Sequence, residues 1–207
     1  MGDLERVIMV KVPSALFDDP FIGIAPEFAT RAECEALITL AEPHLAVAKV
    51  SGEDGSFVTS GRTAKSTWIS YSSSDLVRNI GERIASAAEH PLGHAEAMQI
   101  VRYNLGGEYR PHFDSYDLQT DRGKFNTLKR GQRLCTALLY LNDVQIGGET
   151  AFPKIGLLIP PRSGSLLIFS NCRAATNQIH PKSLHASLPA KSGEKWVATI
   201  WFRERLQ

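Results

Sequence analysis

A histidine and an aspartate two residues apart, His112 and Asp114, form the pair in this chain whose side chains are best suited to bind a metal ion. Alternate side chains of an extended strand point to the same face, so we expect the imidazole and the carboxylate to lie side by side. Two histidines and one carboxylate on one face suit non-haem Fe(II) and leave the opposite coordination positions open. Alone, the pair is also compatible with an ordinary hydrogen-bonded surface couple, so the metal interpretation depends on a third ligand.

Two later histidines are candidates for that third ligand, His180 and His185. His185 lies in a short apolar segment that is typical of a strand, whereas His180 precedes a proline in a polar loop. We therefore predict that His185 completes the site.

A lysine that follows the candidate ligands, Lys195, begins a strand that is otherwise apolar. Burying its ammonium group costs several kcal/mol unless an anion meets it. The sequence leaves two alternatives open, since Lys195 either reaches the sheet edge or pairs with Glu149 or Glu194. A buried cation near a metal site would favour a ligand that carries a carboxylate.

Length, charge and cysteine usage limit the classes of function. The chain has 207 residues, enough for one domain with a substantial core, and a formal net charge of +1 without a basic field for nucleic acid. No apolar run is long enough to span a bilayer, so we expect no membrane partner. The three widely spaced cysteines and the lack of a secretory signal predict reduced thiols and a cytoplasmic location.

Two amphipathic helices are predicted in the first half of the chain. A capping box at Thr30 and Glu33 begins the first helix, which closes at Pro43. The second helix begins at Ser74 and ends before Pro91. Both apolar stripes are expected to belong to the core.

Short strands separated by Gly, Pro and Asn turns are predicted from residue 96 onward. The expected strands are 101–104, 113–116, 134–141, 157–159, 165–169, 183–186 and 196–202. Two helices ahead of many strands predict an α+β domain whose strands close into a two-sheet barrel or jelly roll. We assign 1–207 to one domain, with 1–95 as a helical support region with some strands and 96–205 as the catalytic β core.

One face of the last predicted strand is wholly apolar, with Trp196, Ala198, Ile200 and Phe202 in alternation. This face needs an apolar cover, and the two helices are expected to provide it. Residues 51–61 form either a solvated connection or a mobile flap over a site, and residues 117–132 are predicted to be an insertion loop.

Several ordered blocks of this sequence together resemble the catalytic domain of prolyl 4-hydroxylases, which are Fe(II)- and 2-oxoglutarate-dependent dioxygenases. The blocks are Tyr103, residues 107–114, 133–143, 147–153 and 164–169, the segment 183–186, Lys195, and residues 201–204. The resemblance covers most of residues 98–205. It implies a double-stranded β-helix core of the jelly-roll or cupin type, with the N-terminal helices packed on one sheet.

Site roles also follow from this resemblance. It implies that His112, Asp114 and His185 hold the iron, that Lys195 pairs with the far carboxylate of 2-oxoglutarate, and that Tyr103 and Thr150 add hydrogen bonds. The residues that it implies for substrate binding are Arg133, Tyr109, Trp201 and Arg62. The implied cofactors are Fe(II), 2-oxoglutarate as cosubstrate, O2 and ascorbate as reductant.

We therefore predict a cytoplasmic dioxygenase, a monomer or homodimer, that carries out prolyl 4-hydroxylation of a protein or peptide and releases succinate and CO2. An alternative within enzymes is a hydroxylase of a free amino acid or another small metabolite. Outside the oxygenases, the same histidines and aspartate would suit a zinc hydrolase, and the fold would suit a non-catalytic β-barrel binding protein. A buried Lys195 discriminates against both, since neither needs a cation for a dicarboxylate.

Overall fold

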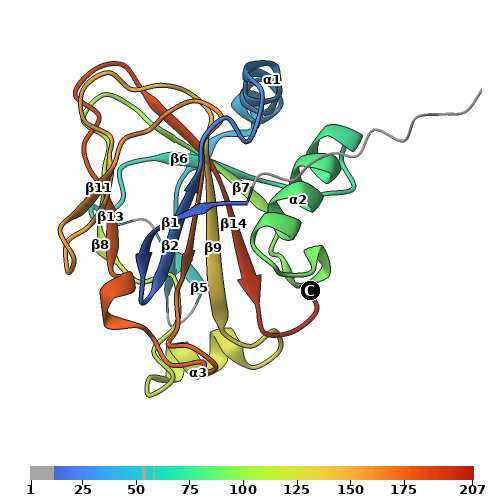
Figure 1. Ribbon diagram of the computed structural model, residues 1–207, viewed down its shortest axis with the longest axis vertical. Coiled ribbons are helices and arrows are strands. Elements are labelled where there is room, and N and C mark those ends of the chain that lie inside the picture. The colour runs from blue at the N-terminus through green and yellow to red at the C-terminus, as the bar shows by residue number, and fades with distance from the viewer. Residues whose placement is uncertain (1–11, 53–54, 58) are drawn as a thin grey trace, which may run out of the picture.

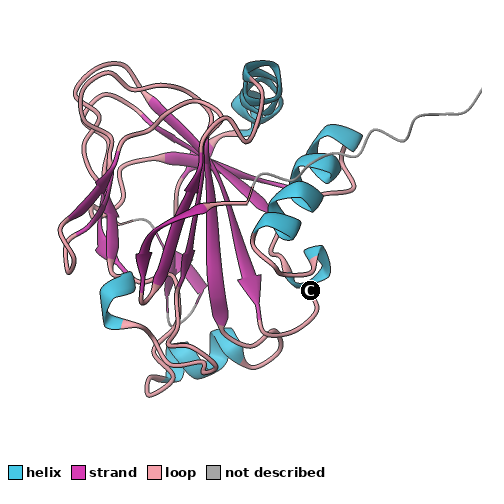
Figure 2. Cartoon of the chain, viewed as in Figure 1, coloured by secondary structure: helices cyan, strands magenta, loops and turns pink. Residues whose placement is uncertain are grey.

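Two antiparallel sheets that face one another make up the body of the protein (Figures 1 and 2). The computed structural model describes residues 12–52, 55–57 and 59–207. The large sheet has the strand order β1 (Ser14–Asp18), β2 (Phe21–Ala25), β12 (Leu166–Ser170), β9 (Arg133–Tyr140), β14 (Lys195–Arg203), β7 (Met98–Tyr103), β6 (Lys65–Ile69) and β3 (Ala46–Val47). The small sheet has the order β11 (Leu157–Ile159), β10 (Thr150–Phe152), β13 (His185–Ser187) and β8 (Tyr109–His112). A hairpin of β4 (Val50–Gly52) and β5 (Gly55–Phe57) stands apart.

Three α helices accompany the sheets in the described part of the chain: α1 (Arg31–Ala41), α2 (Asp75–Ala87) and α3 (Asp121–Thr127). The predicted capping box of α1 is present, because Thr30 accepts from the Glu33 amide while the Glu33 carboxylate accepts from the Thr30 amide. Ser74 caps α2 as predicted. Three single turns of 3-10 helix complete the elements: η1 (Glu42–His44), η2 (Leu92–His94) and η3 (Pro181–Ser183).

The two faces of the large sheet have different neighbours. Figure 1 shows α1 and α2 on the side of this sheet away from the small sheet. Trp196, Ala198, Ile200 and Phe202 of β14 are buried there in one core cluster with residues of both helices, which confirms the predicted cover. The alternate residues of β14 turn the other way, where a second cluster packs Val197 against Phe152 of the small sheet. Lys195 is on this inner face and therefore lies between the sheets.

Pairing between distant segments changed several predicted strand bounds. The strand predicted at 113–116 is wrong, and β8 lies at Tyr109–His112, where His112 pairs with His185 and Tyr109 with Ser187. Proline usually argues against a strand, but β8 is the edge of its sheet, where the missing N–H of Pro111 costs no ladder bond. The strand predicted at 183–186 begins later, at His185, because the residues before it form η3.

The predicted insertion loop at 117–132 contains helix α3. Its N-cap is Thr120, whose side chain accepts from the Gly123 amide at 3.0 Å. A Cβ at Gly123 would meet the Asp117 carbonyl oxygen at 1.8 Å, so the close turn requires glycine there. Gln132 at the end of this segment is fully buried, which corrects its assignment to a peripheral loop.

The structure bears on three further predictions, which concern the extended and flap segments, the cysteines and membrane-spanning helices. The extended segments at 7–24 and the flap at 51–61 include residues 7–11, 53–54 and 58, which lie outside the described residues. All three cysteines, Cys34, Cys135 and Cys172, are free and buried. Across the described ranges, no helix combines the length and apolar character needed to cross a bilayer.

Candidate metal centre

Three predicted ligands meet between the sheets at the small sheet's edge. His112 ends β8, Asp114 follows two residues later, and His185 begins the neighbouring strand β13. The pairing of His112 with His185 places their rings 4.4 Å apart between centroids. The Asp114 carboxylate is 3.6 Å from His112 Nε2 and 3.5 Å from His185 Nε2. One ligand atom from each residue lies within 4.8 Å of the others, close enough for a single metal ion.

The orientation of both imidazoles suits metal binding. Nδ1 of His112 lies 2.8 Å from the Arg110 carbonyl oxygen, and Nδ1 of His185 lies 3.0 Å from the Ser183 carbonyl oxygen. These acceptors favour a proton on Nδ1, so each Nε2 presents its lone pair toward Asp114. Burial lowers the pKa of His185 to about 4, with the Asp114 charge opposing the shift, so this imidazole is neutral at pH 7. Two imidazoles and one carboxylate fit an Fe(II) ion.

Asp114 is supported from beneath by two buried polar residues. Burial disfavours its charged form, but the neighbouring His185 and His112 hold the pKa of Asp114 well below its usual range. Thr136 on β9 donates to Asp114 Oδ2 at 2.7 Å, and Asn171 Nδ2 donates to Thr136 Oγ1 at 2.9 Å. Thr136 and Asn171 thus fix the carboxylate that faces the metal position.

Replacing Thr136 with valine should weaken Fe(II) binding by about 10–100-fold, the usual cost of losing an outer hydrogen bond to a metal ligand. Valine keeps the shape of threonine but has no donor for Asp114 Oδ2. Anaerobic titration with Fe(II) measures the effect. Thr199→Val is the matched control, because Thr199 lines the same cavity without a hydrogen bond to a ligand residue. Equal affinities of the two variants would contradict this role.

A buried cation lies deeper in the same cavity. Lys195 is 1 % exposed, and its Nζ donates to Ser187 Oγ at 2.8 Å. The predicted pairings are not formed, since Glu194 binds Arg102, and no carboxylate lies within ion-pair distance of Lys195 among the described residues. Burial lowers the pKa of Lys195 to about 7, with the charge of Glu149 opposing the shift. The ammonium group therefore has room for an anionic ligand.

Two tyrosine rings lie near this ammonium group. The rings of Tyr103 and Tyr140 lie 5.5 and 5.7 Å from Lys195 Nζ. Tyr140 donates to Thr150 Oγ1 at 2.8 Å, and Thr150 lines the same cavity as Lys195. Sequence reasoning assigned no role to Ser187 or Tyr140. The two-residue period of β9 was the available signal, because it places Thr136 and Tyr140 on one face.

The metal position opens outward into a groove of about 610 Å³. Its walls include Tyr109, Trp201 and Arg62, three of the residues predicted to bind substrate. Nε1 of Trp201 and Nε of Arg62 are buried without a hydrogen-bond partner among the described residues. Trp68 at the rim is 50 % exposed and lies 5.8 Å from Trp201 between ring centroids.

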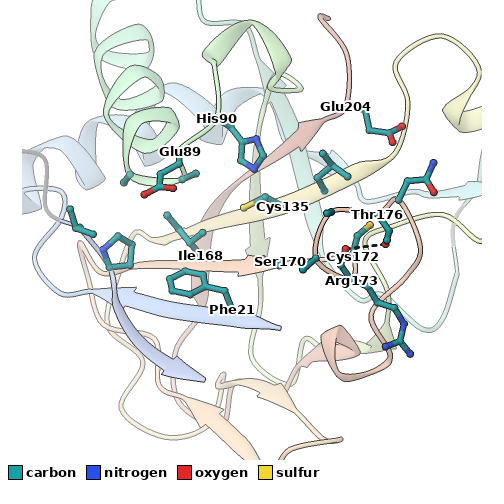
Figure 3. Close-up of a pocket in the computed structure, with 18 residues that line it drawn as sticks. Phe21, Glu89, His90, Cys135, Ile168, Ser170, Cys172, Arg173, Thr176 and Glu204 are labelled. Carbon is teal, nitrogen blue, oxygen red and sulfur yellow. Dashed lines mark hydrogen bonds between the residues drawn. The ribbon is translucent and has the colours of Figure 1, made fainter. Parts of the chain in front are cut away.

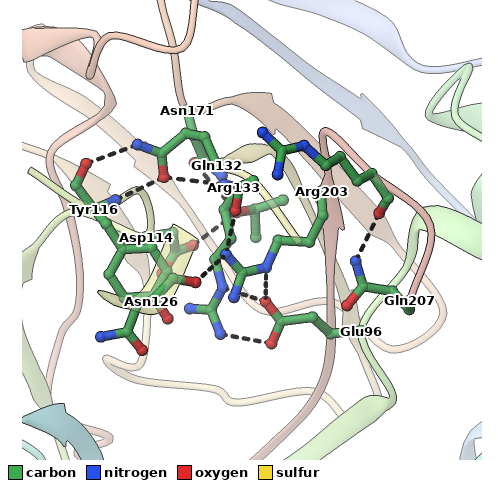
Figure 4. Close-up of polar contacts among 12 residues, drawn as sticks. Glu96, Asp114, Tyr116, Asn126, Gln132, Arg133, Asn171, Arg203 and Gln207 are labelled. Atoms are coloured by element: carbon green, nitrogen blue, oxygen red, sulfur yellow. Dashed lines mark hydrogen bonds and ion pairs between the residues drawn. The ribbon is translucent and has the colours of Figure 1, made fainter. Parts of the chain in front are cut away.

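Arg133, the fourth residue predicted to bind substrate, lines the same groove but is held by an acid. Its Nε and Nη2 donate to the Glu96 carboxylate at 2.6 and 2.7 Å, and Arg203 Nε donates to the same carboxylate at 2.7 Å (Figure 4). The Arg133 guanidinium also lies 4.0 Å from the Trp201 ring centroid. Two cations share one buried carboxylate, so the cluster keeps a positive charge beside the groove. No motif or spacing in the sequence pointed to Glu96.

His180, the alternative ligand, lies away from the cluster. It is buried, with Nε2 3.2 Å from Asp19 Oδ1 and Nδ1 accepting from the Lys182 amide. A separate hollow of about 930 Å³ lies on the helix side of the large sheet, beside His90, Cys135 and Cys172 (Figure 3). None of the candidate metal ligands lines this hollow.

Comparisons with known proteins agree with this geometry. The family model of the 2OG-Fe(II) oxygenase superfamily matches residues 98–203. "Probable prolyl 4-hydroxylase 3" from Arabidopsis thaliana is 34% identical over 88% of this chain and 69% of its own length. "Probable prolyl 4-hydroxylase 9" from the same plant is 37% identical over 88% and 68%. A 2OG complex of the viral collagen prolyl hydroxylase vCPH from Paramecium Bursaria Chlorella virus-1 superimposes with a TM-score of 0.71, at 26% identity, over 91% of this chain and 98% of that one. The likeness to the viral enzyme confirms the predicted double-stranded β-helix.

Proposed function

The chain belongs to the 2OG-Fe(II) oxygenase superfamily, and from this premise we propose that it hydroxylates a prolyl residue in a peptide or protein. It is a 2-oxoglutarate-dependent dioxygenase, so Fe(II), 2-oxoglutarate and dioxygen are its cofactors and cosubstrates. The observation that carries the proposal is the pairing of a His-Asp-His cluster with a buried lysine that lacks a carboxylate partner in the described chain.

The residues of this chain divide the work. His112, Asp114 and His185 would hold Fe(II), and Lys195 would bind the far carboxylate of 2-oxoglutarate, in a cavity that Tyr103 and Thr150 also line. When bound, Fe(II) with 2-oxoglutarate and dioxygen supplies the oxidising power that hydroxylates a C–H bond, and 2-oxoglutarate leaves as succinate and carbon dioxide. Val101, Leu138 and Val197 add apolar side chains to the lining of this cavity and so limit the water around the reacting groups.

The groove supports a peptide rather than a free amino acid. An open groove accommodates residues on either side of the hydroxylated one, whereas a small metabolite would need an enclosed pocket. The half-exposed ring of Trp68 at the rim of the groove offers an apolar face on which a proline ring can pack.

A panel of substrates tests this proposal. Purified enzyme with Fe(II) and 2-oxoglutarate is given proline-containing peptides, matched peptides with alanine for proline, and free amino acids. We expect succinate formation to accelerate with the prolyl peptides only, together with an added oxygen on proline by mass spectrometry. Acceleration by a free amino acid and none by any peptide would favour the metabolite hydroxylase.

Raising the pH should weaken binding of 2-oxoglutarate. Above a pKa of about 7 the ligand-free enzyme loses the proton on Lys195, so binding must first take up that proton. We expect the dissociation constant to rise by about tenfold per pH unit between pH 7.5 and 9. Equilibrium titration measures it. Lys195→Arg, which stays charged, should show no such slope, and an equal slope in both proteins would assign the pH effect to another group.

Two further features belong to the same proposal. Ascorbate is the reductant that keeps iron in its Fe(II) state between turnovers. Faster hydroxylation and succinate formation in the presence of ascorbate would support this role. A cytoplasmic location is consistent with the three free thiols.

A further inference from the structure

Helix α3 and the turn after it present an exposed surface that combines positive charge with large apolar side chains. Figure 1 shows α3 at the end of the molecule opposite α1. The residues of this α3 surface are Arg122, Lys124, Phe125, Leu128, Lys129 and Arg130. All six side chains are exposed, with Phe125 at 69 % and Leu128 at 71 %. Phe125 and Leu128 are three residues apart, so they lie on one side of the helical turn.

This surface is held in place by hydrogen bonds to its backbone. Arg203 Nη1 donates to the carbonyl oxygens of Asn126 and Gly131 at 3.3 and 2.6 Å, and Arg205 Nη1 donates to that of Leu128 at 3.0 Å. Arg203 also donates to Glu96 (Figure 4). The exposed apolar side chains therefore stand on an ordered scaffold, and their position costs little ordering entropy when a partner binds.

The charges of the surface are mostly uncompensated. Lys124 approaches Asp121 at 3.4 Å, where both side chains are well exposed. Arg122, Lys129 and Arg130 form no ion pair within the part of the chain that the structure describes. An acidic segment with apolar side chains complements such a surface in both charge and polarity.

The α3 surface is continuous with the groove that leads to the metal position. Thr120, Arg122 and Gly123 line the same groove as His112 and Asp114. We propose that the α3 surface docks an acidic, apolar segment of the polypeptide substrate, outside the residue that is hydroxylated. The inference rests on the proposed function and adds a substrate class: prolyl sites flanked by an acidic segment with an apolar side chain. Continuity with the groove favours the substrate itself over a separate partner.

Peptide extensions and charge reversal test this inference together. A short prolyl peptide accepted by the enzyme is compared with versions extended at either end by an acidic-apolar segment, a neutral segment or a lysine-rich segment. We expect the acidic-apolar extension at one end to lower KM by about tenfold without changing kcat, and this gain to fall with salt. Fluorescence anisotropy of labelled peptides gives the corresponding dissociation constants.

Variants assign the gain to this surface. Lys124→Glu with Lys129→Glu should abolish the gain from the acidic extension, and Phe125→Ser with Leu128→Ser should reduce it by about fivefold. The side chains are exposed, so these changes leave the fold intact. Arg78→Glu with Arg162→Glu, exposed residues on α2 and ahead of β12, is the matched control and should retain the gain. All variants should turn over the short peptide equally.

The outcomes separate the two proposals. If the acidic extension neither lowers KM nor tightens binding, the docking inference is overturned. Turnover of the short peptide would still support the proposed function. The docking inference is also overturned if Arg78→Glu with Arg162→Glu weakens the effect of the acidic extension as much as the α3 variants do, because the effect then depends on net charge alone. If no peptide is hydroxylated the proposed function falls, and tight binding of the α3 surface to nucleic acid or anionic vesicles instead of acidic peptide would assign this surface to another partner.

Discussion

His185→Ala is expected to abolish tight Fe(II) binding, with a loss greater than about 100-fold, the upper end of what removal of a mere outer-shell partner costs. The variant deletes one of three ligands and leaves Asp114 and His112 with an incomplete site. The loss should be visible by anaerobic Fe(II) titration without any substrate. Activity should disappear with the metal.

His180→Ala is the matched control for this prediction. His180 is also a buried histidine of the same segment, but it pairs with Asp19 and lies outside the cluster. The variant should retain Fe(II) affinity within about threefold, despite some loss of stability from the broken contact. His180→Gln, which keeps polar atoms in the space, serves if alanine prevents folding. Loss of iron binding in the His180 variants and its retention in His185→Ala would mean that the distal ligand is assigned wrongly.

Lys195→Ala should cripple binding and turnover of 2-oxoglutarate while leaving Fe(II) binding largely intact. Removing one partner of a buried charge pair costs about 2–5 kcal/mol, equivalent to at least about 30-fold in affinity. The metal site is spared because Lys195 Nζ donates to Ser187 and not to a ligand residue. Titration of the iron-loaded enzyme with 2-oxoglutarate, followed by its charge-transfer absorption, measures the loss.

Lys195→Met controls for packing in this experiment. Methionine fills most of the volume of the lysine stem, and removal of an unpaired buried cation is expected to raise the temperature of unfolding. If both variants bind 2-oxoglutarate weakly and Lys195→Met is at least as stable as the wild type, the loss of affinity comes from the missing charge and not from a packing defect. Wild-type affinity in Lys195→Met would remove the dicarboxylate argument.

Local signals in the sequence predicted the elements whose stability is local. The Thr30 capping box and the Ser74 cap set the starts of α1 and α2 without reference to the rest of the chain. The alternation in β14 predicted both of its faces, because one face has only apolar residues and the other begins with Lys195. The alternation left the surroundings of Lys195 open, and only the family resemblance predicted that Lys195 lies in the same site as the ligands.

Long-range pairing decided the features that the sequence did not predict. Tyr109–His112 becomes a strand because β13 supplies its hydrogen-bond partners, and its edge position tolerates Pro111. Helix α3 carries Gly123, a weak helix former that is needed for close approach to Asp117. No local pattern could predict this requirement.

The candidate site shows the same division. Residue chemistry and spacing identified His112 and Asp114 and favoured His185 over His180 as the third ligand. The structure brings His112, Asp114 and His185 together. The supports of these ligands come from strands far away in the sequence. Thr136 is such a case, since its hydroxyl can be recognised as a partner of Asp114 only when the fold brings β9 of the large sheet to the residues that follow β8.

The most direct measurement of the central claim uses isotopically labelled dioxygen. The Fe(II)-loaded enzyme, 2-oxoglutarate and the preferred prolyl peptide are mixed under labelled dioxygen, and both products are weighed by mass spectrometry. We expect one labelled oxygen atom in succinate and one in the hydroxylated prolyl residue, in equal amounts, with neither product formed by His185→Ala. A peptide hydroxylated with oxygen from water alone, or left unmodified while 2-oxoglutarate is consumed with a different substrate, would contradict it.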